Sequence, residues 1–166
     1  MPTTDYIEIP LTQGQVTRIS PHRHKEIKGF KWYAVWMKLA QSFYAATKMR
    51  DENNKRCVVY LHRYLLGLKK GDPRTGDHID HDTLNNLDEN LRIATHAEQI
   101  RNQRMKKCNS SGFKGIWKPK RSLKWRAKVV LNRKVVFLKD FSTPEEAHAA
   151  YCEAVKKFHG EFASIT

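Results

Sequence analysis

The spacing of apolar residues changes from the strand period to the helix period near the end of the chain, and this change constrains the fold most. Three segments rich in β-branched and aromatic residues predict strands. They are residues 113–118, 124–131 and 134–141. Basic and apolar side chains alternate along the middle segment, so we expect a sheet with one basic face and one apolar face.

A single amphipathic helix is expected after these strands. Its apolar stripe recurs at helical spacing. The stripe consists of Ala147, Ala150, Tyr151, Ala154, Val155 and Phe158. Thr143, Pro144 and Glu146 predict the first turn through a capping box, and Gly160 predicts the end. Because the helix stripe can cover the apolar face of the sheet, residues 112–166 are expected to form a complete small domain.

The rest of the chain predicts short strands and short helices. Aromatic and β-branched runs predict strands at 31–37, 43–49 and 57–61, and a strand at 91–95. A helix is expected at 62–67, where Gly67 ends it, and another from Thr95 to about Met105. The small and basic run 106–111 has the composition of a linker.

Charge is distributed unevenly along the chain. The 31 Lys and Arg against 17 Asp and Glu give a formal net charge of +14. Counted by segment, residues 1–70 carry +8 (13 basic, 5 acidic), 71–104 carry −3 (4 and 7) and 105–166 carry +9 (14 and 5). So much basic charge indicates a polyanionic partner. Carboxylates between two basic segments would repel phosphate unless a cation lies among them, although charge alone favours the simpler interpretation of a solvated acidic loop.

The sequence argues against secretion and against a membrane span. It contains no apolar run of the length that a spanning helix needs, and the first ten residues lack the basic and apolar regions of a signal peptide. The three cysteines, Cys57, Cys108 and Cys152, are more than 40 residues apart, which suits neither a disulfide framework nor a paired-cysteine zinc site. We expect a reduced protein in the cytoplasm.

Imidazole, carboxylate and amide groups are concentrated in residues 77–95, which read DHIDHDTLNNLDENLRIAT. A hard divalent cation such as Mg²⁺ prefers oxygen ligands and keeps several waters, so a carboxylate and an amide carbonyl can hold it beside a phosphate. A histidine with an ordinary pKa near ~6.5 can take a proton from an attacking water. This set of groups suits phosphodiester hydrolysis.

The same segment resembles the HNH homing endonucleases of phages, whose signature is D-H-x-D-G-x-x-x-N-N-x-x-x-N-L-R-x-x-T. The resemblance implies that Asp77 is a metal ligand, that His78 is the general base, and that Asn90, 12 residues later, braces the loop that holds His78. It further implies a Mg²⁺ or Mn²⁺ cofactor. The helix position that ligates the metal in the family is Gln99 here, with His96 and Asn102 as substitute ligands.

Other residues of this region carry less specific expectations. His81 stands where the family usually has a turn glycine. Asp80 and Asp82 are expected to form turns, since Asp and Asn bond their own main chain. Asn85 and Asn86 are expected to cap the same loop. Arg63 follows a histidine upstream, as in the family, and is interpreted as a catalytic phosphate contact or as a structural ion-pair partner.

Residues 112–163 resemble the Apetala2-type DNA-binding domain, which is also found fused to phage HNH nucleases. The basic face of the expected sheet would then enter a major groove of double-stranded DNA. The candidate DNA-binding residues are Lys114, Trp117, Lys118, Lys120, Arg121, Lys124, Arg126 and Lys128. Phe137 is expected on the same face.

We therefore expect an α+β chain with three parts. Residues 1–105 would form an HNH nuclease domain, with β-hairpin lead-in strands in 1–70 and a ββα-metal core in 71–105. Residues 106–111 would be the linker, and 112–166 a three-stranded antiparallel sheet packed on one helix.

Two functions fit this organisation. One is a metal-dependent DNA endonuclease that nicks selected sites, with no membrane and no obligate protein partner. The other is a sequence-specific DNA-binding protein whose nuclease core lost activity when the helix ligand became Gln99. RNA binding is a further alternative that charge alone leaves open.

Overall fold

The computed structural model describes residues 5–102, 109 and 111–163 of the 166-residue chain. Contacts between residues divide it into two compact units, Met1–His96 and Ala97–Thr166. The sequence predicts a boundary later, at 106–111, and most of that segment lies outside the described residues. None of the described helices is long and apolar enough to cross a membrane.

The first unit begins with a β-hairpin. Strands β1 (Ile7–Pro10) and β2 (Val16–Ile19) pair antiparallel, and β2 pairs in parallel with the short strand β7 (Asn85–Asn86). The one-turn helices η1 (Pro21–Arg23) and α1 (His24–Ile27) follow β2. The β2–β7 pairing joins this hairpin to the segment that carries the signature.

A second sheet lies in the same unit, with strand order β3-β4-β5. Its strands β3 (Tyr33–Met37), β4 (Ser42–Arg50) and β5 (Arg56–Tyr60) pair antiparallel, which confirms the three strands predicted there. Helix α2 (Leu61–Leu65) follows β5 directly, one residue earlier than predicted. The aromatic and β-branched content of these segments was therefore sufficient to predict the three strands from the sequence.

The signature segment forms a two-stranded ladder. Strand β6 (Thr75–His78) pairs antiparallel with β8 (Leu91–Ala94), and the one-turn helix η2 (Asp88–Asn90) precedes β8. Helix α3 (His96–Asn102) follows β8 in the chain, and the remainder of the predicted helix, from 103 to 105, lies outside the described residues. Strands β6 and β8 and helix α3 thus follow one another along the chain, with β7 and η2 between the two strands.

One apolar core unites the first unit. Its buried residues are Ile19, Ile27, Trp32, Ala45, Leu61, Leu65 and Leu91. They come from β2, α1, the residue before β3, β4, α2 and β8. These elements therefore share one core. The indole Nε1 of Trp32 donates to the carbonyl of Ile27 at 3.1 Å, which satisfies the polar atom of the largest core side chain.

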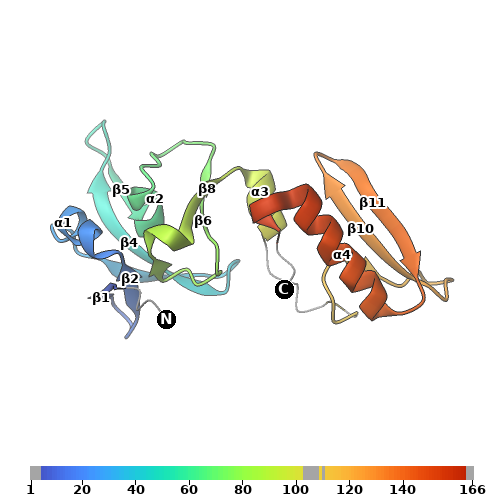
Figure 1. The fold of residues 1–166 in the computed structure, drawn as a ribbon. Helices are drawn as coiled ribbons and strands as arrows, with labels where there is room; N and C mark the ends of the chain where they lie inside the picture. Colours follow the sequence, from blue (N-terminus) through green and yellow to red (C-terminus); the bar gives the residue numbers. More distant parts are fainter. Residues whose placement is uncertain (1–4, 103–108, 110, 164–166) are drawn as a thin grey trace. The chain divides into compact units, whose positions relative to one another are not determined.

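The second unit contains the predicted sheet and helix. Strands β9 (Ile116–Trp117), β10 (Trp125–Leu131) and β11 (Lys134–Phe141) pair antiparallel in the order β11-β10-β9. Helix α4 (Pro144–His159) lies across one face of this sheet and ends in the one-turn helix η3 (Gly160–Phe162) (Figure 1). The predicted strand at 113–118 is shorter than expected, and the other elements are confirmed.

Helix α4 begins with the predicted capping box. The hydroxyl of Thr143 accepts a hydrogen bond from the amide of Glu146 at 3.2 Å, and the Glu146 carboxylate accepts one from the amide of Thr143 at 3.3 Å. The core between helix and sheet contains Ile116, Ala127, Val129, Ala147, Tyr151, Ala154 and Val155. The alternation along β10 and the stripe on α4 therefore meet, as the sequence predicts.

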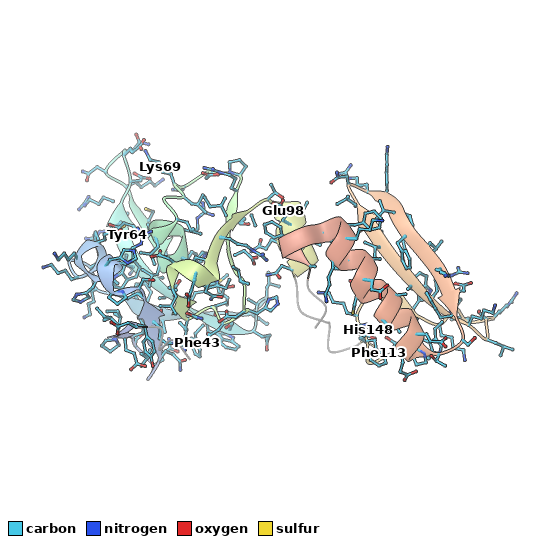
Figure 2. All side chains as sticks on the ribbon, in the orientation of Figure 1. Phe43, Tyr64, Lys69, Glu98, Phe113 and His148 are labelled. Carbon is cyan, nitrogen blue, oxygen red and sulfur yellow. The ribbon has the colours of Figure 1, made fainter. Side chains whose placement is uncertain are left out.

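Close packing at one end of this core depends on a glycine. Gly115 has a φ of +76°, and a Cβ at this position would collide with the ring of Tyr151. Phe113 packs on His148 of α4, with the ring centroids 4.7 Å apart (Figure 2). The loop before β9 is thus held against α4 by an aromatic contact on one side and a bare backbone on the other.

Candidate active site

The loop between β6 and β7 is fixed by a reciprocal pair of side chains, Asp80 and Asn90. The Asn90 Oδ1 accepts a hydrogen bond from the Asp80 amide at 3.0 Å, and its Nδ2 donates to the Asp80 Oδ1 at 2.9 Å. The same Nδ2 donates to the carbonyl of Asn85 at 2.8 Å, and the Asn90 carbonyl accepts from the Ile79 amide at 2.9 Å. Asn90 is 6% exposed, so these bonds are shielded from water. The loop that follows His78 is therefore held in one conformation.

A tight turn directly after His78 explains the glycine that the signature usually has. The amide of His81 donates to the carbonyl of His78 at 3.1 Å, and His81 has a φ of +64°. Glycine adopts this left-handed conformation without strain, whereas a histidine adopts it at some cost. The departure from the signature at His81 thus leaves the turn in place.

Asp80 and Asp82 have the turn-forming role predicted from the sequence. The Asp80 Oδ1 accepts from the amide of Asp82 at 2.8 Å, and the Asp82 Oδ1 accepts from the amide of Leu84 at 3.1 Å. The second oxygen of Asp82 accepts from Arg18 of β2 at 2.7 Å. The two carboxylates therefore stabilise the turn of this loop, and Asp82 also ties the loop to the hairpin through Arg18.

Asp77 faces Arg92 directly across the β6–β8 ladder. Both Nε and Nη2 of Arg92 lie 2.9 Å from Oδ2 of Asp77. The side chains are 8% and 10% exposed, respectively. A buried carboxylate needs such a partner, because its desolvation would otherwise be costly. One edge of the Asp77 carboxylate is therefore neutralised by this chain's own arginine.

His78, the next residue of β6, is 5% exposed and contacts a buried amide. Its Nε2 lies 3.3 Å from the Oδ1 of Asn86. Burial lowers the pKa of His78 below its ordinary value, while the hydrogen bond to Asn86 and the carboxylates of Asp80, Asp77 and Asp82 oppose this shift. A lowered pKa keeps the imidazole neutral at pH 7, which is the form that can accept a proton.

Aromatic rings surround His78 on the side of the second sheet. His62 of α2 lies edge-on to it with ring centroids 5.1 Å apart, and Tyr44 of β4 lies at 6.2 Å. Tyr60 stacks on His62 at 5.9 Å. Burial lowers the pKa of His62 to about 3, with smaller contributions from His78 and Arg63, so His62 stays uncharged. Because His62 is uncharged, the aromatic wall beside His78 behaves as an apolar surface, although His62 and Tyr44 each carry a polar group.

The His62 ring requires a glycine on the neighbouring strand. Gly76 is buried, and a Cβ at this position would lie 2.5 Å from Cδ2 of His62. Burial, followed by the charge of Asp77, raises the pKa of Tyr44, so its hydroxyl remains protonated beside the site. Helix α2 therefore packs closely on the backbone of β6.

Arg63 points to the loop before β6. Its Nη2 donates to the carbonyl of Lys69 at 2.8 Å and its Nη1 to the carbonyl of Arg74 at 3.3 Å. These contacts make it a brace between α2 and residues 69–74, which is closer to the structural interpretation of the sequence than to the phosphate contact.

The predicted helix ligand, Gln99, lies on α3, and contacts assign all of α3 except His96 to the second unit. Gln99 is half-buried, His96 is exposed and Asn102 is 5% exposed. Asp77, His78 and Asn90 thus lie in the first unit, as does His96, whereas Gln99 and Asn102 lie in the second.

The donor atoms of the candidate ligands fit a hard cation. A carboxylate from Asp77 and an amide carbonyl from Gln99 are both oxygen ligands of the kind that Mg²⁺ and Mn²⁺ prefer. Within residues 5–102, 109 and 111–163, no group of three or more His, Cys, Asp or Glu side chains is arranged to hold a metal ion. A cation at Asp77 would share the carboxylate with Arg92.

The exposed face of the β9–β10–β11 sheet, in the second unit, contains three of the candidate DNA-binding residues in two rows. In the first row, Trp117, Arg126 and Asp140 are aligned across the three strands. Arg126 makes two hydrogen bonds to Asp140, at 2.6 and 2.8 Å, so its charge is paired. In the second row Lys128 is aligned with Leu138. This face therefore combines cationic and apolar side chains, where the sequence predicts a basic face.

Two more apolar residues of this face lie beyond a β-bulge. The register shifts between Val129 and Val130, after which Val130 pairs with Val135. Val130, Val135 and Leu138 are 39%, 51% and 55% exposed, respectively. Phe137, which the sequence places on this face, is instead aligned with Val129 and packs in the core, because residues alternate faces along β11.

The other candidate DNA-binding residues differ in exposure. Four of them are exposed, namely Lys118, Lys120, Arg121 and Lys124. Lys114 is half-buried, and burial lowers the pKa of its ammonium group, so it is the least available to a phosphate. The ammonium of Lys118 lies 5.8 Å from the ring centroid of Trp125.

Several residues of the site were not singled out by the sequence. Thr17 and Tyr44 come from strands far from the signature in sequence. His62, the histidine before Arg63, was noted as a family feature but was given no role in the site. Asn86 was assigned to loop capping, although its amide faces His78. Arg92 belongs to the signature itself, and its antiparallel alignment with Asp77 is the signal that would have identified it.

Comparison with known proteins identifies the family. An uncharacterized HNH endonuclease of Acanthamoeba polyphaga mimivirus is 38% identical over 152 residues, which are 92% of this chain and 75% of the relative. Protein 3.8 of Escherichia phage T7 is 34% identical over 88 residues, 52% of this chain and 71% of the relative. No family model matches, and no solved structure matches significantly. On the extent of the first of these similarities, together with the signature at residues 77–95, the chain belongs to the HNH endonuclease family.

Proposed function

We propose that the chain is a metal-dependent DNA endonuclease that hydrolyses phosphodiester bonds, with His78 as the general base. The observation that carries the proposal is the placement of His78: a buried imidazole, in the residue after Asp77, at the end of a strand whose following loop is fixed by Asn90. A buried histidine with a lowered pKa is neutral at physiological pH and can accept a proton from water. The family of this chain supports the same activity.

Asp77 would supply an oxygen ligand to Mg²⁺ or Mn²⁺, and the resemblance to the HNH signature implies Gln99 as the helix ligand. Such an ion, when bound, stabilises the negative charge that develops on the phosphate and on the leaving oxygen. The chain's own residues position the reaction: Asn90 fixes the loop after His78, Arg92 holds the Asp77 carboxylate in place, and the His62 and Tyr44 rings exclude water from one side of His78.

The substrate we propose is double-stranded DNA, bound in part by the exposed face of the β9–β10–β11 sheet. Lys128 and the exposed lysines before β10 offer cations to phosphates, and Trp117, Leu138 and Val135 offer apolar surface. Apolar side chains in a major groove contact the methyl group of thymine. The similarity of residues 112–163 to the Apetala2-type domain supports this assignment, and a net charge of +14 favours a polyanion.

A single centre of this kind cuts one strand at a time, so we propose site-selective nicking as the activity of the monomer. The two viral relatives fit an enzyme that acts in the cytoplasm of a phage-infected or virus-infected cell.

The test is relaxation of a supercoiled plasmid with Mg²⁺ or Mn²⁺, with and without a chelator, followed by mapping of the ends. The proposal expects nicks that require the metal and that recur at defined sequences. No cleavage by the parent, together with cleavage by Gln99→Asn, would favour the alternative that this chain binds DNA but has lost activity through its helix ligand.

A further inference from the structure

Three residues from different strands form one buried line of hydrogen bonds that ends at His78. We propose that Thr17 and Asn86 are positioning residues that set the tautomer of His78, so that the proton is on Nε2 and the basic lone pair is on Nδ1. The proposal rests on the proposed function for its consequence in catalysis, but the tautomer itself is a property of the protein alone.

The line begins at a group that can only accept. The hydroxyl of Thr17 lies 2.8 Å from the carbonyl oxygen of Leu84, and the same oxygen accepts the amide of Arg18 at 2.9 Å. A main-chain carbonyl has no proton to give, so the Thr17 hydroxyl must donate its one proton to it. The oxygen of Thr17 is then left as an acceptor for its other neighbour.

That neighbour is the side-chain amide of Asn86, whose Nδ2 lies 2.8 Å from the Thr17 hydroxyl oxygen. Because Thr17 has no second proton, the group that faces it must be the NH₂ of Asn86. The orientation of the Asn86 amide is therefore determined by chemistry and does not depend on the similar shapes of its oxygen and nitrogen. Its Oδ1 consequently faces His78.

The last step transfers this polarity to the imidazole. Asn86 Oδ1 lies 3.3 Å from Nε2 of His78, and an amide oxygen can only accept. Thr17 is fully buried and Asn86 is 1% exposed, so water cannot easily substitute for either partner. The neutral ring of His78 therefore carries its proton on Nε2, and Nδ1 is the nitrogen that can accept a proton.

The arrangement gives the N-terminal hairpin a role in the active site. Thr17 lies on β2 and Asn86 on β7, and these strands pair in parallel through Arg18 with Asn85 and Ile19 with Asn86. A general base must be present in the correct tautomer, and a second group commonly fixes it by bonding the other ring nitrogen. Here the hairpin supplies the second half of that device, 61 residues away from His78 in the sequence.

The experiment uses the full chain with ¹⁵N-labelled histidine, without added metal, at a pH where His78 is neutral. Long-range ¹H–¹⁵N spectra distinguish a protonated Nε2 from a protonated Nδ1. Thr17→Val removes the hydroxyl at nearly constant shape, Thr17→Ser keeps it, and Thr47→Val is the matched control. Thr47 is also buried, at 3% exposed, and its hydroxyl donates to the carbonyl of Lys31 at 2.9 Å, so its loss costs a comparable hydrogen bond elsewhere in the first unit.

We expect Nε2–H at His78 in the parent, in Thr17→Ser and in Thr47→Val, and a mixture of tautomers in Thr17→Val. Under single-turnover conditions with Mg²⁺, Thr17→Val should cleave plasmid roughly 10 to 100-fold more slowly, the range seen for loss of a group that orients an active-site histidine. Its DNA affinity should be unchanged.

A protonated Nδ1 at His78 in the parent, or an unchanged Nε2–H signal in Thr17→Val, would overturn the proposal. The spectrum of the parent decides the question even where Thr17→Val does not fold. If the parent shows Nε2–H but never cleaves DNA, then the proposed function has failed while the assignment of the tautomer stands.

Discussion

The guanidinium of Arg92 lies against the carboxylate of Asp77 across the β6–β8 ladder, with Nε and Nη2 both 2.9 Å from a single oxygen, Oδ2. Both side chains are almost fully buried. The candidate metal ligand therefore has an internal cation as partner, which lets a carboxylate remain buried in the first unit when no metal is bound.

Replacing Arg92 should destabilise the first unit strongly. Arg92→Gln leaves the Asp77 carboxylate buried without a charged partner, and breaking a buried pair in this way costs about 3 to 5 kcal/mol. Urea unfolding followed by tryptophan fluorescence measures this change. Added Mg²⁺ should recover more stability in Arg92→Gln than in the parent, because the ion replaces the guanidinium.

The matched control for this variant is Arg74→Gln. Arg74 also pairs with an aspartate, Asp72, at 2.8 Å, but its side chain is 55% exposed. An exposed pair contributes about 1 kcal/mol or less, so the control should unfold almost as the parent does. Equal losses in the two variants would show that burial of the Asp77 pair has no special weight.

Replacing Asn90 should disorder the loop after His78. Asn90→Ala removes three hydrogen bonds of a buried side chain, two with Asp80 and one with the carbonyl of Asn85. We expect a loss of about 2 to 4 kcal/mol in unfolding free energy and a fall of about 100-fold in cleavage rate, as for a small displacement of a reacting group.

Asn90→Asp sharpens this test because it keeps the acceptor for the Asp80 amide but sets two carboxylates against each other. It should be at least as damaging as Asn90→Ala. Asn53→Ala, at an exposed turn residue of the first unit, should leave both stability and cleavage unchanged. A folded Asn90→Ala protein that cleaves at the parental rate would show that the loop fixed by Asn90 does not position His78 for cleavage.

Much of the fold could be predicted from local pattern. The strands of the second sheet, β8, β10, β11 and α4 were expected close to their observed bounds, because each has a clear period and explicit turns or caps. Strand β6 is not among the predicted strands, since Thr75 and Gly76 have no strand signal of their own and become a strand only by pairing with β8. Phe137 was assigned to the wrong face because the bulge near Val129 alters the register of the hairpin.

The site was predictable only where it is contiguous in sequence. Asp77, His78 and Asn90 lie within one segment, so their spacing identified them. Thr17 and His62 reach the same place through tertiary packing, which no local pattern encodes. Asn86 has the same residue type as its neighbour Asn85, and only the structure separates the one that faces His78 from the one that bonds Asp80.

Acid should destabilise the first unit partly through His62. Burial lowers its pKa from 6.5 to about 3 in the folded chain. The unfolded chain therefore binds more protons between these values, so the contribution of His62 to stability is complete above about pH 6.5 and is lost as the pH falls toward 3. Unfolding free energies of the parent and of His62→Gln, measured from pH 7 to pH 4, should show a smaller slope in the variant. Parallel curves would mean that His62 is exposed to protons in the folded state.

Removing one carboxylate from the exposed face of the β9–β10–β11 sheet should strengthen DNA binding. Asp140→Asn releases Arg126 from its ion pair and removes a negative charge from the face proposed to meet phosphates. We expect tighter binding to duplex DNA and a salt dependence that is steeper by about one phosphate contact. Glu153→Gln, an exposed residue of α4, makes the same change in net charge as a control. If both variants gain equally, the sheet is not the DNA-binding face.

The most direct test of the whole account is the single-turnover rate of plasmid nicking by His78→Ala, measured beside the parent at saturating Mg²⁺. Binding of the same DNA by both proteins, measured in parallel, shows that the variant still engages its substrate. The account predicts metal-dependent nicking by the parent and a loss of about 100-fold or more in the variant, the contribution of a general base, at unchanged affinity for DNA. Nicking by His78→Ala at the parental rate would contradict it.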